Sequence, residues 1–189
     1  MNASKEVFIT KRDGSKVKLD LDKIHFVVEE ACEGLTGVSA SQIEMNADLQ
    51  FYDGMTTDEI QNILIRSAND LISLESPNYQ YAAARLLSYD VRKEAHGQYE
   101  YIPLLKLILR NIRSGVYDKG ILDKYTKTDI KKFNTWIKRE RDLKFTYAGL
   151  RQICDKYLVQ DRSTGQLYET PQDMYMMIAA TLFAEYPTK

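Results

Sequence analysis

Strand-forming sequence is confined to four short segments of this chain, and that restriction limits its fold more than any other feature. Residues 6–10 and 17–19 are rich in β-formers and flank the turn Lys11-Arg12-Asp13-Gly14, whose D-G pair is typical of a hairpin. A second hairpin is predicted where residues 157–160 and 166–168 flank another glycine-containing turn. Two such hairpins are too small to form an extended sheet, so the core must come from helices.

Apolar residues recur at steps of three and four along most of the remaining sequence, which is the period of amphipathic helices. Asp20 or Asp22 can cap a first helix, and capping-box patterns begin at Ser39 and Thr56. The apolar positions of these three helices span residues 24–35, 43–51 and 60–72, and further helices are predicted over residues 77–97, 104–114, 128–140, 147–157 and 170–184. The predicted fold class is mainly α (α+β): a short β-hairpin or small sheet on a four-helix bundle, followed by a helical region with a second small hairpin.

A domain boundary is predicted near residue 97. Gly97 ends the fourth predicted helix, and Pro103 follows it before the next helical period begins. Residues 1–97 are therefore expected to form an α+β domain, and residues 98–189 a helical one.

Charge and hydropathy exclude several classes of protein. Lys and Arg total 26 against 27 Asp and Glu, so the net charge of −1 gives no overall attraction to DNA or to an anionic membrane. The longest nearly apolar stretch, residues 174–184, is far shorter than the roughly 20 residues needed to cross a bilayer. Residues 1–10 lack the apolar segment of a secretory signal. We therefore expect a cytoplasmic protein with neither DNA nor a membrane as its partner.

Basic residues nevertheless gather around the first hairpin. They are Lys11, Arg12, Lys16, Lys18 and Lys23. A turn that carries cations, next to the N-terminus of a helix, can bind phosphate oxygens. The same cluster also fits a solvated edge hairpin whose lysines prevent pairing with other sheets. The sequence has no Walker A motif and no G-x-G-x-x-G, so a phosphate site here would be neither a P-loop nor a Rossmann site.

Several segments carry a resemblance to one family. In chain order they are Phe8-Ile-Thr-Lys-Arg-Asp-Gly14, Leu19-Asp-Leu-Asp-Lys-Ile24, Asp53-Gly-Met-Thr-Thr-Asp-Glu-Ile60, Pro77-Asn-Tyr-Gln-Tyr-Ala-Ala-Ala-Arg85 and Arg92-Lys93. They resemble the ATP-cone at the amino end of class I ribonucleotide reductase large subunits of the bacterial and bacteriophage type. Later segments, from Tyr99-Glu100 to Tyr168-Glu169, resemble the helical region between the cone and the catalytic barrel of the same subunit.

The resemblance implies an allosteric site that reads ATP as an activator and dATP as an inhibitor, with magnesium on the triphosphate. Carried over by position, the nucleotide-binding residues are Lys11, Arg12, Val17, Asp20, Lys23, Thr57, Gln61 and Lys93. The four cations and Thr57 would meet phosphates. Val17 and Gln61 stand where the family pattern has Glu and His, so recognition of the ribose or base is expected to differ.

Cysteine content limits what this chain can catalyse. Ribonucleotide reduction in the family needs three thiols inside the barrel, whereas this sequence has only Cys32 and Cys154. The resemblance therefore implies a regulatory amino-terminal part with no catalysis of its own. Its implied partners are the remainder of the large subunit, in the same or a separate chain, and the radical-generating small subunit. Two alternatives stay open: a free-standing nucleotide sensor, and a degenerate cone that only docks on partners.

The last predicted helix is apolar on more than one face. Met174, Met176, Met177, Ile178, Leu182 and Phe183 fall within ten positions. Either neighbouring helices cover this surface, or part of it packs against the barrel.

Overall fold

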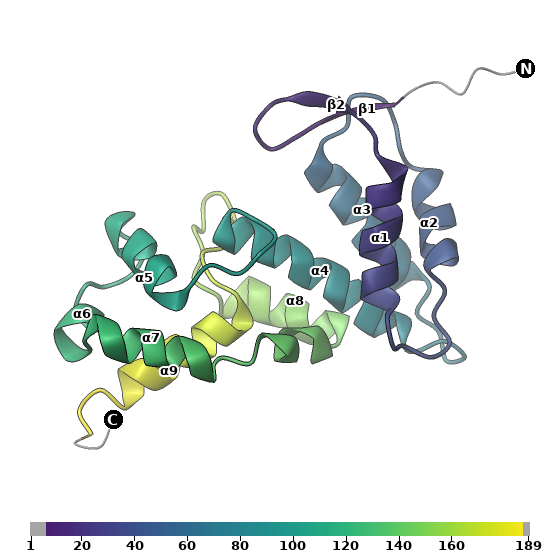
Figure 1. Cartoon of the computed structure of the whole chain (residues 1–189). Coiled ribbons are helices and arrows are strands. Elements are labelled where there is room, and N and C mark those ends of the chain that lie inside the picture. Colours follow the sequence, from purple (N-terminus) through teal and green to yellow (C-terminus); the bar gives the residue numbers. More distant parts are fainter. Residues whose placement is uncertain (1–6, 187–189) are drawn as a thin grey trace, which may run out of the picture. The chain divides into compact units, whose positions relative to one another are not determined.

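The computed structural model describes residues 7–186, and the chain within that range divides into two compact units. One unit holds the residues up to Leu87 together with Phe145–Ala148, and the other holds Ser88–Lys144 and the residues from Gly149 onward. Figure 1 labels the elements of both units. The division falls inside a helix, ahead of Gly97, and the domain boundary expected at residue 97 remains a prediction.

The first unit begins with the predicted hairpin. Strand β1 (Phe8–Thr10) pairs antiparallel with β2 (Lys16–Lys18), and Ile9 lies opposite Val17. Gly14 has φ +82°, a left-handed conformation that most residues avoid, so the D-G turn closes the hairpin as expected. β2 starts and ends one residue earlier than predicted.

The hairpin is also fastened to the start of a helix along its other edge. Thr10 N–H donates to the Met55 carbonyl at 2.9 Å, and Gly54 N–H donates to the Phe8 carbonyl at 2.8 Å. Thr10 and Thr56 form an isolated parallel bridge. Phe8 N–H also donates to the Asp53 carboxylate at 2.8 Å. These bonds place the turn of the hairpin beside the helix that starts at Thr57.

The helices of the first unit follow the apolar periods of the sequence. They are α1 (Leu21–Cys32), α2 (Ala40–Asp48), α3 (Thr57–Asp70) and the first part of α4 (Tyr79–His96). Asp20 caps α1, and Thr56 forms a full capping box with Glu59 at the start of α3. The buried faces of these helices meet in a core that includes Val28, Ile43, Leu64 and Leu86. This arrangement is the predicted hairpin on a helical bundle (Figure 1).

The second unit is helical, also as predicted. Besides the end of α4 its elements are α5 (Leu104–Arg113), α6 (Ile121–Lys124), α7 (Lys127–Trp136), the 3-10 helix η1 (Arg139–Lys144), α8 (Tyr147–Lys156) from Gly149 onward, and α9 (Pro171–Leu182). Its core joins Leu107 and Ile108 of α5 to Phe133 of α7 and Ala180 of α9. No helix of residues 7–186 is both long enough and apolar enough to span a membrane.

Three further details differ from the sequence prediction. α7 ends at Trp136 rather than near residue 140, because Ile137 turns to an extended backbone (ψ 127°) and packs against the core. α4 begins at Tyr79, after a turn at Pro77 rather than at it. The second hairpin is reduced to a single bridge between Gln160 and Leu167, because the Val159 N–H donates to the Glu169 carboxylate at 3.0 Å and not to the backbone of the facing strand.

Candidate functional site

The turn of the first hairpin is held in one conformation by local hydrogen bonds. Lys11 N–H donates to the Ser15 carbonyl at 2.8 Å, and Gly14 N–H donates to the Lys11 carbonyl at 2.9 Å. The Asp13 carboxylate accepts from the N–H and the hydroxyl of Ser15, and these bonds lower the pKa of Asp13. Lys11 and Arg12 are therefore presented to solvent on a preformed turn, as an anion site requires.

Arg12 connects this turn to the start of α3. Its guanidinium Nε lies 2.6 Å from Oδ1 of Asp58, and both side chains are about half exposed. Thr57 is the first residue of α3, where the unpaired N–H groups of a helix favour negative charge. The turn and this helix N-terminus thus face the same region of solvent.

Asp20 and Lys23 lie at the start of α1, just after the hairpin. The Asp20 carboxylate caps the helix by accepting from Lys23 N–H at 3.2 Å, and it also pairs with Lys23 Nζ at 3.1 Å. The bonds from Lys23 lower the pKa of Asp20. Lys23 remains 82% exposed, so its ammonium group can change partners at little cost.

The two positions that depart from the family pattern have structural surroundings of their own. Val17 is half-buried in β2, on the same face as the buried Ile9. Gln61 is buried on α3, and its side-chain N–H donates to the Leu86 carbonyl of α4 at 2.8 Å. The Gln61 amide therefore joins two helices of the first unit.

Lys93, the remaining predicted site residue, lies on α4 beyond Leu87 and belongs to the second unit. Its ammonium group is 5.8 Å from the centre of the Tyr99 ring. Its part in a nucleotide site stays a prediction.

Asp58 is the residue of this region that sequence reasoning missed. An acidic residue in the first turn of a helix is ordinarily explained by the helix dipole, so Asp58 carried no separate signal. Its contact with Arg12 depends on the pairing of β1 with residues 54–56, and no local sequence pattern predicts that pairing.

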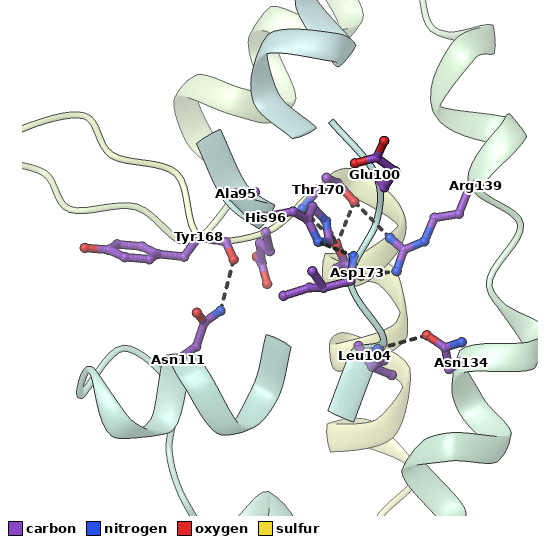
Figure 2. Close-up of polar contacts among 12 residues, drawn as sticks. Ala95, His96, Glu100, Leu104, Asn111, Asn134, Arg139, Tyr168, Thr170 and Asp173 are labelled. Carbon is purple, nitrogen blue, oxygen red and sulfur yellow. Dashed lines mark hydrogen bonds and ion pairs between the residues drawn. The ribbon is translucent and has the colours of Figure 1, made fainter. Parts of the chain in front are cut away.

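Figure 2 shows a second polar cluster, in the second unit, whose members His96, Thr170 and Asp173 are buried. The fully buried Asp173 of α9 lies 3.1 Å from His96 Nε2 and 2.6 Å from Arg139 Nη2, and it accepts from Thr170 Oγ1 at 2.7 Å. His96 Nδ1 in turn accepts from Ile102 N–H at 3.2 Å. Burial alone would raise the pKa of Asp173, but the bonds from His96 and Arg139 outweigh it and hold that pKa far below its usual value. This cluster locks the end of α4 to α9.

Neither cysteine has the surroundings of a reactive thiol. Burial raises the pKa of Cys32 to about 11 and that of Cys154 to about 12. Both thiols are therefore protonated near neutral pH and behave as small apolar groups. Within residues 7–186, no group of three or more His, Cys, Asp or Glu side chains is placed to hold a metal ion.

Comparison with known proteins gives this fold a family. Residues 7–94 match the ATP cone domain, and residues 143–188 match the all-alpha domain of ribonucleotide reductase. A cone followed by that domain is the arrangement of the amino-terminal part of a ribonucleotide reductase large subunit, and this chain belongs to that family. The family expected from the sequence is thereby confirmed.

Individual relatives agree with this class. The chain is 45% identical to ribonucleoside-diphosphate reductase 1 subunit alpha of Escherichia coli (strain K12) over 184 residues, which are 97% of this chain and 24% of that protein. It is 42% identical to the ribonucleoside-diphosphate reductase subunit alpha of Enterobacteria phage T4 over 179 residues, 95% of this chain and 24% of that protein. The chain thus spans about a quarter of the length of these curated relatives.

Proposed function

We propose that the first unit binds the triphosphate of ATP or dATP, with Mg²⁺, and that this binding controls overall ribonucleotide reduction. The observation that most strongly supports this proposal is the Arg12–Asp58 contact, which holds a preformed cationic turn beside the N-terminus of α3. Lys11 and Arg12 would bind phosphates from the turn, Thr57 from α3 and Lys23 from α1. Lys93 is kept in the proposed set by its position in the family pattern.

Binding would proceed by exchange of partners. Without nucleotide, Arg12 pairs with Asp58 and Lys23 pairs with Asp20. A triphosphate carries more charge than either carboxylate and offers a guanidinium several oxygens, so it can displace Asp58 from Arg12. Asp20 would keep its capping bond to Lys23 N–H while the ammonium group turns to a phosphate.

Calorimetric titration of the chain with ATP and with dATP, each with Mg²⁺, tests this proposal. Heat of binding is expected for both nucleotides. Lys11→Ala should weaken binding by about 1.5–3 kcal/mol, the range for hydrogen bonds to charged groups. Lys16→Ala is the matched control, because Lys16 lies on β2 outside the turn and should leave affinity unchanged. Absence of binding by the native chain would favour the alternative of a degenerate cone that only docks on partners.

The chain would act as one component of a larger cytoplasmic enzyme and would not reduce nucleotides alone. Its relatives are ribonucleoside-diphosphate reductase alpha subunits about four times as long, and neither Cys32 nor Cys154 has an activated thiol. The proposed partners are the remainder of the large subunit, with its catalytic barrel, and the radical-generating small subunit.

A groove along α9 is the surface we assign to the remainder of the large subunit. It has a volume of about 580 Å³, and its walls include Val116, Met174, Met177, Ile178 and Leu182. Ile178 is 48% exposed and Leu182 67% exposed. Apolar side chains gathered in a groove favour a protein partner over water.

A further inference from the structure

The face of the hairpin that points away from the core combines an aromatic side chain with cations. Phe8 lies opposite Lys18 in the register, and Thr10 lies opposite Lys16, so these four residues share one face. Ile9 alternates to the inner face and is buried. Phe8 is 44% exposed and both lysines are exposed. We call Phe8, Lys16 and Lys18 the hairpin face.

A hollow with the opposite character lies at the far end of α1. It has a volume of about 670 Å³ and is formed by the last turns of α1 and the start of α2. Its apolar lining residues are Phe26, Cys32, Val38 and Ala40. Three glutamates, Glu29, Glu30 and Glu33, line it as well. His25 lies 3.2 Å from the Glu29 carboxylate, and the Arg85 guanidinium donates to the Glu33 carbonyl at 2.6 Å. We call this site the acidic hollow.

The two surfaces cannot meet within one molecule. Figure 1 shows the hairpin at the first turn of α1. The residues that line the acidic hollow belong instead to the last turns of α1 and to the segment that leads into α2. A helix of 12 residues is about 18 Å long, so α1 itself separates the two surfaces. Both surfaces belong to the first unit, and their separation is fixed by its core.

We propose that the hairpin face of one copy of this chain docks into the acidic hollow of a second copy. Phe8 would enter among Phe26, Val38 and Ala40, and Lys16 and Lys18 would meet the glutamates of the rim. The charge complementarity of the two surfaces, together with an exposed aromatic residue on each, selects a second copy as the occupant. The net charge of −1 leaves no general repulsion between copies. The contact joins unlike surfaces, so it would be head-to-tail.

This inference goes beyond the proposed nucleotide site, because neither Lys11 nor Arg12 takes part in the contact. Sedimentation equilibrium without nucleotide tests it over a range of concentrations. The average mass should rise with concentration at about 0.05 M salt and return to that of the monomer at about 0.5 M salt, because screening weakens exposed ion pairs. Association through the apolar groove of α9 would instead persist at high salt.

Charge reversal with mixing makes the test decisive. Lys16→Glu/Lys18→Glu should weaken self-association at least tenfold, and Glu29→Lys/Glu33→Lys should do the same. An equimolar mixture of the two variants should associate again, because the reversed hairpin face of one fits the reversed hollow of the other. Lys127→Glu/Lys131→Glu, which makes the same change of charge on exposed residues of α7, should associate like the native chain. Circular dichroism verifies that each variant is folded.

A native chain that stays monomeric at low salt would overturn the proposal. So would reversals that leave association unchanged, or a mixture of the two variants that fails to associate. None of these results depends on nucleotide binding, so failure here and failure of the proposed effector site are distinguishable.

Discussion

Arg12 and Asp58 show at the scale of single residues how the candidate site is preset. The carboxylate holds the guanidinium in place at the start of α3, but it also occupies the group that a phosphate would need. An exposed pair of this kind is worth roughly 0.2–1 kcal/mol. Asp58 is therefore both a positioning group and a weak competitor for the nucleotide.

Asp58→Asn should accordingly tighten the binding of ATP by roughly two- to fivefold, since the variant loses both the competing contact and a like charge near the triphosphate. Calorimetric titration of the variant beside Asp48→Asn measures the effect. Asp48 is exposed at the end of α2 and provides the same change of charge away from the turn. Unchanged or weaker binding in Asp58→Asn would show that the pair does not compete with nucleotide.

Two buried carboxylates of the second unit illustrate opposite effects on stability. The pKa of Asp173 is held low by bonds from His96 and Arg139. Its contribution to the free energy of unfolding is therefore full above the unfolded-state pKa and is lost as pH falls through the folded-state pKa. Asp173→Asn should cost about 3–5 kcal/mol at neutral pH, because it breaks a buried pair and leaves Arg139 uncompensated. Urea denaturation measures this loss, and a cost under about 1 kcal/mol would contradict the assigned role.

The pKa of Asp142 is shifted in the opposite direction to that of Asp173. Burial raises its pKa to about 7, against the opposing effects of Gln172 and Arg139. The folded state therefore binds the proton more tightly than the unfolded state, and stability falls as pH rises from about 4 through 7. Asp142→Asn should flatten this fall and stabilise the chain at pH 8, by about 1.4 kcal/mol for each unit of the pKa shift. Denaturation curves at several pH values decide, and a parallel pH profile in native chain and variant would contradict the prediction.

At the scale of elements, the sequence predicted what depends on local pattern. Apolar periods and caps located the helices, and the D-G pair located the hairpin turn, because these signals lie within a few residues of the structures they specify. The end of α7 and the shortness of the second hairpin were missed, because Ile137 and Val159 are placed by contacts outside their own helix or turn. Likewise the cations of the candidate site were identified in advance, whereas the partners Asp58 and Leu86, contacted by Arg12 and Gln61, required the folded chain.

At the scale of the whole molecule, the apolar groove of α9 concerns the contact between this chain and its proposed partner. The sequence left open whether neighbouring helices cover the apolar surface of the last helix. They do not cover all of it, since Ile178, Leu182 and Phe183 remain exposed among the described residues. A surface of this kind binds hydrophobic dyes.

Ile178→Glu/Leu182→Glu should therefore abolish the fluorescence of a hydrophobic dye bound to the chain. Ile178 is 48% exposed and Leu182 is 67% exposed, so the free energy of unfolding should change by no more than about 0.5 kcal/mol for each. Leu74→Glu is the control, because Leu74 is 95% exposed in the other unit. A native chain that binds no dye would contradict the assignment of this groove to a partner.

We expect a nucleoside triphosphate to bind at the turn of the first hairpin. Backbone amide NMR during titration with ATP and Mg²⁺ is the sharpest test of this binding, because the amide shifts report both that the nucleotide binds and where it binds. We expect shifts of the amides of residues 11–15, 20–23 and 56–58, with those of α7 unmoved, and loss of these shifts in Lys11→Ala. Shifts confined to other regions, or none at saturating nucleotide, would contradict it.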